Sequence, residues 1–293
     1  MPSMKKKLVF VTNPFSGARS KQNLVSLLNQ NIEKDLFDYE LIYTQYPQHA
    51  TQISIDAAAN GVFAVIAVGG DGTINEVAQG LLHTNTALGI LPFGSGNGFS
   101  YHLGFKRDII KALQAINKCQ VSSIDTGSAN GRFFINVAGL GLDATVAYKT
   151  KLNTKRGFLP YFINTLRESL DFKFMSLSIE SKELSITGEY AMAAVANGSI
   201  YGYEFAVAPE AKLDDGLFDV LLVKKTQIFR YFLLVPMMLN KTFHKSSLVD
   251  FIRTDQIKIT NHSNAYFHVD GEGLEGDYEI SFQIHPKSLL LLH

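Results

Sequence analysis

The sequence predicts an α/β plus all-β protein, with an N-terminal Rossmann-like domain built on a parallel sheet and a C-terminal antiparallel β-sandwich. In the first part of the chain, apolar strand-like runs alternate with stretches of helical periodicity, which is typical of a parallel sheet. In the second part, strand-like runs follow one another with turn residues between them. The length of 293 residues also suits two domains of about 100–200 residues each. We expect domains 1–127 and 128–293, and leave open whether the last strand, 287–293, returns to the first domain.

The first domain is expected to alternate strand and helix in a regular order. The expected strands cover residues 8–12, 39–44, 62–68 and 87–91. The third strand is continuously apolar, as in a strand that helices cover on both faces. After the first strand, Leu24, Leu28 and Ile32 show the spacing of one helical face. The same spacing predicts helices that end near residue 60, follow residue 73 and include residues 109–116.

The second domain is expected to consist mainly of strands. Its strand-like runs are FFINVAG, KFMSLSI, LSITGEYAMAAVA, GLFDVLLV, DQIKIT, NAYFHVD and DYEISFQI. Only two helices stand out, around residues 157–170 and 227–239. The closing SLLLLH indicates a short strand, but the sequence does not identify its sheet.

The composition excludes several classes of protein. The chain has 27 basic and 27 acidic residues, so no overall positive field favours nucleic acid as a partner. Cys119 is the only cysteine, which excludes an intrachain disulfide and fits a reducing compartment, so we expect a cytoplasmic protein. The apolar run 231–239 contains Pro236 and is far shorter than the roughly 18–20 residues of a membrane span. We therefore expect no transmembrane segment.

A glycine-rich loop joins the third expected strand to a helix. In GGDGTINEV, Gly69, Gly70 and Gly72 let a ligand approach the backbone, and the helix that follows presents free amide groups at its N-terminus. Thr73, with Glu76 three residues later, predicts a capping box at the start of this helix. The arrangement favours a phosphate chain as the ligand.

Asp71 in the same loop needs an explanation, because a carboxylate repels phosphate. It can bind Mg²⁺, directly or through water, or it can accept a proton from an attacking hydroxyl group. Both roles belong to phosphoryl transfer. Alternatively, Asp71 only caps the helix or closes a turn. A short glycine motif alone does not decide between these interpretations.

A second glycine loop, LPFGSGNGF, covers residues 91–99 after the next strand. Loops at the carboxyl ends of neighbouring parallel strands lie side by side, where α/β sheets bind ligands. The loop after the first strand would reach the same rim and offer Asn13, Ser16, Gly17 and Arg19, the last as a phosphate partner. The chain has no GK, HRD or DFG, and Phe99 stands where GxGxxG requires its third glycine. The Walker A, protein-kinase and dinucleotide-binding patterns are therefore absent.

Five motifs together resemble the diacylglycerol kinase catalytic-domain family, which includes bacterial diacylglycerol and YegS-like lipid kinases and the sphingosine kinases. The motifs are NPFSG, GGDGTINEV, LPFGSGN, KLDDGLFDV and VDGE, in the family's order and approximate spacing. The resemblance covers essentially the whole chain. It implies an ATP-dependent lipid kinase with a fold related to that of NAD kinases.

The resemblance and the loop analysis together imply a role for each motif residue. ATP would be bound by Asn13, Pro14, Phe15, Ser16, Gly17, Arg19, Thr44, Gly69, Gly70, Asp71, Gly72, Thr73, Asn75, Glu76, Gly94, Ser95 and Asn97. Glu272 would be the general base, and Asp71 and Asp125 would organise Mg²⁺ through water. A structural Mg²⁺ site would use Asp215 with the carbonyl groups of Lys212 and Leu217.

One residue departs from the family's pattern, and this departure concerns the lipid substrate. Many bacterial members carry an acidic residue where this chain has Gly98, whereas the GSGN form is similar to that of sphingosine kinases. The acceptor is therefore expected to be diacylglycerol-like or sphingoid-like. His102 and His268 lie near the motifs, but neither is assigned a role.

The expected partner is a lipid presented at a membrane surface, with no nucleic acid. Peripheral contact with the inner face of the membrane and a homodimer are left open. Two other functions remain: an NAD kinase-type nucleotide kinase, and a non-catalytic regulator that binds nucleotide or lipid. The presence of Asp71, Asp125 and Glu272 together argues against the regulator.

Overall fold

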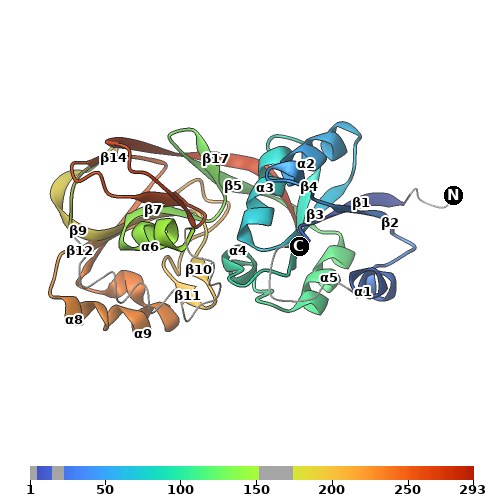
Figure 1. The fold of residues 1–293 in the computed structure, drawn as a ribbon, viewed down its shortest axis with the longest axis horizontal. Coiled ribbons are helices and arrows are strands. Elements are labelled where there is room, and N and C mark those ends of the chain that lie inside the picture. The colour runs from blue at the N-terminus through green and yellow to red at the C-terminus, as the bar shows by residue number, and fades with distance from the viewer. Residues whose placement is uncertain (1–4, 15–22, 152–173) are drawn as a thin grey trace. The chain divides into compact units, whose positions relative to one another are not determined.

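The structure is a computed structural model that describes residues 5–14, 23–151 and 174–293. The chain forms two compact units, one of residues 1–124 with 287–293 and one of residues 125–286. The expected fold class is confirmed, because the first unit is α/β and the second is an antiparallel β-sandwich (Figure 1). Four expected ATP-binding residues, Phe15, Ser16, Gly17 and Arg19, and the expected helix 157–170 lie outside the described residues.

The first unit contains a parallel sheet with the strand order β17-β4-β3-β1-β2. Its strands are β1 (Lys6–Thr12), β2 (Phe37–Tyr43), β3 (Ala64–Gly69), β4 (Ala87–Pro92) and the last residues of β17 (Glu279–Leu292). Leu291 of β17 pairs in parallel with Leu88 of β4. The closing apolar segment is therefore the strand next to β4 in this sheet.

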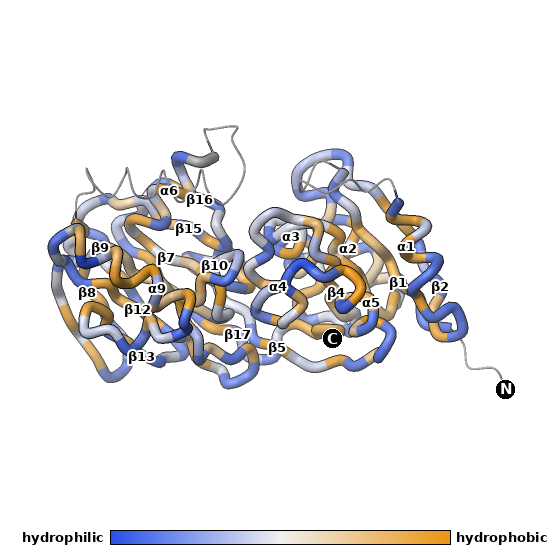
Figure 2. Tube along the Cα trace, turned by 90° about the horizontal axis from the view of Figure 1, so that it is seen from below, coloured by the Kyte–Doolittle hydropathy of each residue, from blue (hydrophilic) through white to orange (hydrophobic). Residues whose placement is uncertain are grey.

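Helices cover both faces of the sheet (Figure 1). They are α1 (Leu24–Asn31), α2 (His49–Ala59), α3 (Asp71–Leu81), the short α4 (Gly98–His102) and α5 (Ile109–Lys118). Ile66 of β3 packs in one core with Leu28 of α1 and Leu113 of α5. The next residue along β3, Ala67, points to the other face and is equally buried. This double coverage explains the continuous apolar run in the sequence, visible in Figure 2 as hydrophobic colour along the strands.

The predicted start of α3 is wrong. The helix begins at Asp71, with Gly70 as an extended N-cap residue that makes no side-chain capping bond. Thr73 therefore lies inside the first turn and forms no capping box with Glu76. Instead, Glu76 Oε2 accepts the amide of Ala50 at 3.3 Å, in the first turn of α2. The helix starts before the predicted position because β3 ends at Gly69 and one extended residue, Gly70, connects the strand to the helix.

The second unit is built from antiparallel strand pairs. Its strands are β5 (Val121–Ala129, from Asp125 onward), β6 (Arg132–Phe134), β7 (Val137–Gly141), β8 (Met175–Glu180), β9 (Ser185–Ala196), β10 (Ile200–Gly202), β11 (Phe205–Ala206), β12 (Phe218–Lys224), β13 (Val249–Thr254), β14 (Gln256–Asn261), β15 (Phe267–Val269), β16 (Glu272–Leu274) and the first part of β17. Residues 185–190 of β9 pair with β8, whereas residues 192–196 pair with β7 and β12. The long strand β9 thus joins the two layers around one core that includes Phe134, Phe218 and Phe282.

The helices of the second unit differ from the prediction. The described ones are α6 (Leu142–Lys151), α8 (Ile228–Tyr231), α9 (Leu234–Leu239) and the 3-10 turn η1 (Phe243–Lys245). Neither α6 nor β13 was predicted, because the apolar residues of α6 do not share one helical face and β13 alternates only weakly. The expected helix 227–239 is split in two. Pro236 has no amide to donate to the carbonyl of Phe232, so the hydrogen-bond ladder is interrupted there.

Candidate nucleotide-binding and catalytic residues

The carboxyl ends of the parallel strands bring the predicted glycine loops of the first unit together. Gly69 at the end of β3 is in register with Pro92 at the end of β4. The amides of Phe93 and Gly94 both donate to the carbonyl of Gly69 at 2.9 Å. The two loops therefore lie side by side, as the strand order predicted.

The loops also approach each other without intervening side chains. A Cβ atom added to Gly94 would lie 2.3 Å from the Cα of Gly70, far inside van der Waals contact. A Cβ on Gly70 would lie 3.1 Å from the Cα of Gly94. Two backbones that pack this closely require glycine at residue 94.

Asp71 joins the first loop to the second. Its Oδ2 accepts the amide of Gly98 at 3.1 Å, and its Oδ1 accepts the amide of Phe99 at 3.2 Å. Asp71 is the first residue of α3, yet its carboxylate caps the start of α4. The side chain therefore has a structural role in holding the loops. Gly98 contributes only its backbone amide to this contact.

Asn97, between these loops, is fully buried and has a left-handed backbone conformation with φ of 54°. Its Nδ2 donates to the carbonyl of Gly94 at 2.9 Å. Its Oδ1 has no hydrogen-bond partner among the described residues. A buried acceptor without a partner is costly, and it suits a site that a polar ligand completes.

Most of the other expected ATP-binding residues line the same edge of the sheet. Thr44, just beyond β2, is buried and donates its amide to the carbonyl of Thr12 at 2.9 Å. Thr73 packs against Gly69, where a Cβ would lie 2.3 Å from the threonine Oγ1. Asn13, Pro14, Gly72, Asn75 and Ser95 also follow or flank these strand ends. Glu76 differs, because its carboxylate is directed to α2.

His102 ends α4 and stacks on Phe99, with ring centroids 6.2 Å apart. Burial lowers the pKa of His102 from its usual 6.5 to about 4. The histidine is therefore neutral at physiological pH and adds no charge beside the glycine loops.

In the second unit, Asp125 is fully buried and tied to the KLDDG segment. Its Oδ2 accepts the amide of Gly216 at 2.7 Å, and its own amide donates to the carbonyl of Leu213. Asp215 in this segment is exposed, and its Oδ1 accepts the amide of Leu217 at 3.1 Å. The predicted catalytic aspartate and the predicted metal site are thus parts of one hydrogen-bonded structure.

The described residues contain no group of three or more histidine, cysteine, aspartate or glutamate side chains that could hold a metal ion. The expected structural Mg²⁺ site is of another kind, since it needs one carboxylate, from Asp215, and the two carbonyl groups of Lys212 and Leu217.

Glu272 lies next to a tight hairpin turn between β15 and β16. It pairs with Val269 across the two-residue turn, in which Asp270 and Gly271 have φ of 47° and 81°. This turn requires positive φ at both positions, which Asp-Gly tolerates well. The Glu272 side chain is exposed, as a group that meets a substrate must be.

Asp270 fixes the position of this hairpin. Its carboxylate accepts the amides of Ile135 at 2.9 Å, Asn136 at 2.9 Å and Val137 at 3.1 Å. Its amide donates to the carbonyl of Val137 at 2.9 Å. Three amide donors on one carboxylate make a strong, charge-assisted anchor.

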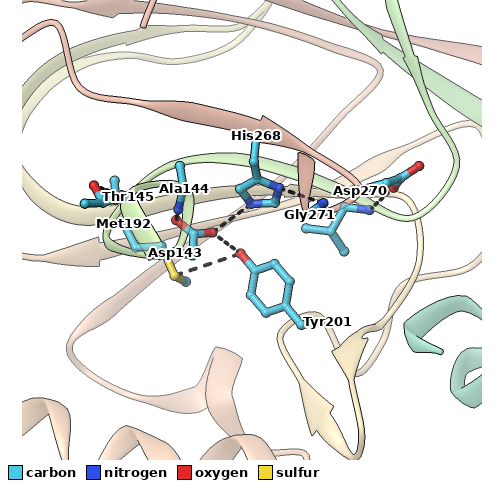
Figure 3. Close-up of polar contacts among 10 residues, drawn as sticks. Asp143, Ala144, Thr145, Met192, Tyr201, His268, Asp270 and Gly271 are labelled. Carbon is cyan, nitrogen blue, oxygen red and sulfur yellow. Dashed lines mark hydrogen bonds and ion pairs between the residues drawn. The ribbon is translucent and has the colours of Figure 1, made fainter. Parts of the chain in front are cut away.

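A buried polar network lies beneath the hairpin (Figure 3). His268 is 2% exposed, and its Nε2 lies 3.0 Å from Oδ2 of Asp143 near the start of α6. Its Nδ1 accepts the amide of Gly271 at 3.3 Å, which places the ring proton on Nε2. The hydroxyl group of Tyr201 donates to the same Asp143 oxygen. The imidazole therefore connects Asp143 to the turn that precedes Glu272.

Sequence reasoning missed this network. His268 and Asp143 are 125 residues apart, and neither belongs to a motif with recognisable spacing. The only signal was the position of His268 two residues before the DGE triplet.

Two family models match the chain. The model of the diacylglycerol kinase catalytic domain matches residues 7–129. The model of the YegS C-terminal NAD kinase beta sandwich-like domain matches residues 136–293. These matches support a kinase of the diacylglycerol kinase type. The chain belongs to the diacylglycerol kinase family.

Individual relatives agree with this assignment. A diacylglycerol kinase of Staphylococcus aureus (strain MRSA252) is 30% identical over 92% of this chain and 87% of the relative. A diacylglycerol kinase of Bacillus subtilis (strain 168) is 29% identical over 91% of this chain and 90% of the relative. Both alignments extend over nearly the full length of the two chains.

Solved structures agree on the fold. The crystal structure of a diacylglycerol kinase from Bacillus anthracis str. Sterne has a TM-score of 0.75 at 24% identity, covering 99% of this chain and 97% of the other. An NAD kinase from Archaeoglobus fulgidus in complex with ATP has a TM-score of 0.52 at 14% identity, covering 98% and 93%. Along the described part of the chain, every helix is too short or too polar to span a bilayer.

Proposed function

We propose that this protein is an ATP-dependent lipid kinase that transfers the γ-phosphoryl group of ATP to the hydroxyl group of diacylglycerol. The observation that carries the proposal is the junction of the two glycine loops, where the Asp71 carboxylate accepts the amides of Gly98 and Phe99. The relatives named diacylglycerol kinase support diacylglycerol as the acceptor. The lipid would be met at a membrane surface from the cytoplasmic side.

The glycine loops are proposed to hold the phosphate chain of ATP. The amides at the start of α3 offer donors and a partial positive charge, and Gly70 and Gly94 carry no side chain to keep phosphate oxygens away. The buried Oδ1 of Asn97 is an acceptor for a donor on the bound nucleotide or on ordered water. Asn13 and Thr44 lie at the same edge of the sheet and are proposed to contact ATP as well.

Asp71 and Asp125 are proposed to organise Mg²⁺ through water. Both offer carboxylate oxygen atoms, the ligand type that Mg²⁺ prefers, and backbone amides fix the orientation of both side chains. Bound Mg²⁺ would neutralise the charge of the phosphates. Asp215, with the carbonyl groups of Lys212 and Leu217, is proposed to hold a second, structural Mg²⁺ ion.

Glu272 is proposed as the general base. The lipid hydroxyl oxygen would form a bond to the γ-phosphorus, the bond from that phosphorus to the bridging oxygen of ADP would break, and Glu272 would accept the hydroxyl proton. Its exposure and its position beside a rigid two-residue turn support this role.

The test is a transfer assay with labelled ATP, Mg²⁺ and separate acceptors, namely diacylglycerol, sphingosine and NAD. We expect label in phosphatidic acid, identified by mass spectrometry. Label in sphingosine phosphate would change the acceptor, and label in NADP would replace the proposal by an NAD kinase. ATP binding without any labelled product would instead indicate a non-catalytic regulator.

A further inference from the structure

The outward side of α8 and α9 is apolar, and we call it the α8–α9 surface. Phe229, Phe232, Leu233 and Leu239 are 61%, 52%, 62% and 47% exposed. Pro236, between them, is also exposed. Their spacing of three or four residues places them on one side of this helical segment. Figure 2 shows the hydrophobic character of α9.

The inward side of the same segment is apolar too. Leu234 is 6% exposed and packs in a core cluster with Leu221 and Phe243. Tyr231 and Met238 pack against this cluster. A helical segment that is apolar on both sides is normally covered on both sides. A contiguous exposed patch of large apolar side chains therefore marks a surface that another molecule covers.

Within residues 224–248, the segment that contains this surface, the lysine, arginine, aspartate and glutamate side chains have one sign. Residues 224–248 include five lysine or arginine residues and no aspartate or glutamate. Lys224 forms an ion pair with Asp250 at 2.6 Å, and Lys225 forms one with Glu189 at 2.8 Å. Within the described ranges, no ion pair involves the other three, Arg230, Lys241 and Lys245. These three cations are exposed.

We propose that the α8–α9 surface docks this protein onto a lipid bilayer that contains anionic lipids. Phe229, Phe232 and Leu233 would enter the boundary between headgroups and acyl chains, while the cations nearby would meet headgroup phosphates. This combination of exposed apolar side chains and flanking lysine and arginine is typical of interfacial helices. The choice of a bilayer as the partner rests on the proposed lipid kinase function.

A second copy of the chain fits this surface less well. In a symmetric dimer the same patch faces itself, so Arg230, Lys241 and Lys245 would approach their own copies. No carboxylate within residues 224–248 is available to neutralise them. Like charges brought together at an interface oppose association, whereas an anionic membrane surface attracts them.

The experiment is co-sedimentation of the full-length protein with vesicles of phosphatidylcholine alone and of phosphatidylcholine with phosphatidylglycerol. We expect binding to the vesicles that contain phosphatidylglycerol, and weaker binding as salt is raised. Phe229→Glu should lower the partition coefficient by about tenfold, because one large apolar side chain no longer inserts. Tyr278→Glu is the matched control, since Tyr278 is also 61% exposed but lies outside this surface, and it should bind as the wild type does.

Charge is tested separately. Arg230→Glu should reduce binding to the anionic vesicles by about fivefold, whereas Arg132→Glu, at an exposed position outside the α8–α9 surface, should not. Unchanged vesicle binding by Phe229→Glu would overturn the proposal. It would also be overturned if light scattering showed a dimer that Phe232→Glu converts to a monomer, because a second copy would then be the partner.

A kinase assay separates this inference from the proposed function. Phe229→Glu should phosphorylate a short-chain, water-soluble diacylglycerol at the wild-type rate but lose activity on diacylglycerol embedded in vesicles. If the wild type phosphorylates neither lipid while vesicle binding still depends on Phe229, the proposed function fails and the docking surface stands. If Phe229→Glu loses both activities equally, the effect is not one of docking and the inference fails.

Discussion

The imidazole of His268 and the carboxylate of Asp143 meet at 3.0 Å beneath the hairpin that carries Glu272. The other ring nitrogen of His268 accepts the amide of Gly271. A single buried side chain therefore links the start of α6 to the turn next to the proposed general base. This arrangement limits the positions that the hairpin can adopt.

Replacing His268 should loosen the hairpin and reduce turnover. In His268→Ala the amide of Gly271 and the carboxylate of Asp143 each lose a buried partner, which costs about 1–3 kcal/mol per group. We expect kcat to fall about tenfold with little change in the KM for ATP. Tyr201→Phe is the comparison, because it removes one hydrogen bond to Asp143 and leaves the turn intact. Equal kcat in His268→Ala and the wild type would show that the network does not position Glu272.

Replacing Glu272 tests the proton transfer itself. Glu272→Gln keeps the size of the side chain but cannot accept the proton, so kcat should fall by roughly 10²–10⁴-fold. ATP binding, measured by calorimetry, should be unchanged. Glu275→Gln, three residues later and also exposed, should keep wild-type activity. Full activity of Glu272→Gln would assign the proton to another group.

The close approach of the glycine loops makes a third test possible. Gly94→Ala places a Cβ 2.3 Å from the Cα of Gly70 and must push the two loops apart. We expect a loss of about 1–3 kcal/mol in unfolding free energy and at least tenfold weaker ATP binding. Gly72→Ala is the control for stability alone, because a Cβ there has no neighbour within 4 Å and should leave the unfolding free energy nearly unchanged. An ATP affinity of Gly94→Ala equal to that of the wild type would mean that the loop contact does not shape the site.

Asp71→Asn separates the structural role of Asp71 from its charge. The amide group of asparagine would face one of the two amide donors of Gly98 and Phe99, so one hydrogen bond is lost. We expect a stability loss of about 1–3 kcal/mol together with a weaker dependence of activity on Mg²⁺. Asp38→Asn, at an exposed carboxylate in β2, controls for the change of net charge. A normal Mg²⁺ titration in Asp71→Asn would limit Asp71 to holding the loops.

His102 should make stability depend on pH. Burial lowers its pKa from the usual 6.5 to about 4, so between these values the unfolded chain binds a proton that the folded chain does not. The contribution of His102 to the free energy of unfolding is therefore fully present above pH 6.5 and is lost as the pH falls toward 4. At about 1.4 kcal/mol per pKa unit, the total loss is about 3 kcal/mol. Urea unfolding of the wild type and His102→Asn should show a flatter pH profile for the variant. The exposed His83→Asn should retain the wild-type slope.

The sequence was sufficient to predict those parts of the site that lie within one short stretch of the chain. A strand, a glycine loop and a helix occur within a few consecutive residues, and the parallel order then places Gly69 and Gly94 side by side. The capping box failed because Thr73 and Glu76 have the right spacing but lie inside the helix, where Glu76 bonds to Ala50 instead. Short-range patterns do not reveal whether a long-range partner competes for the same carboxylate.

The remaining features depend on residues that are distant in sequence. Asp143, Tyr201 and His268 come from three separate elements, and only the folded sandwich brings them together. The sequence did not predict the exposed side of α8 and α9 either. A run such as YFLLVPMML is typical of a buried core, and only the structure shows which of its side chains are exposed.

The first unit contains the two ends of the described chain. Residues 287–293 belong to it, Leu291 pairs with Leu88, and Leu289 and Leu292 are each 1% exposed. During synthesis on the ribosome, the edge of β4 that β17 covers therefore stays unpaired until residues 287–293 have emerged. An unpaired apolar edge invites pairing with other nascent chains. Expressing residues 1–124 alone should consequently yield inclusion bodies, and fusing residues 287–293 behind residue 124 through a flexible linker should restore a folded fragment.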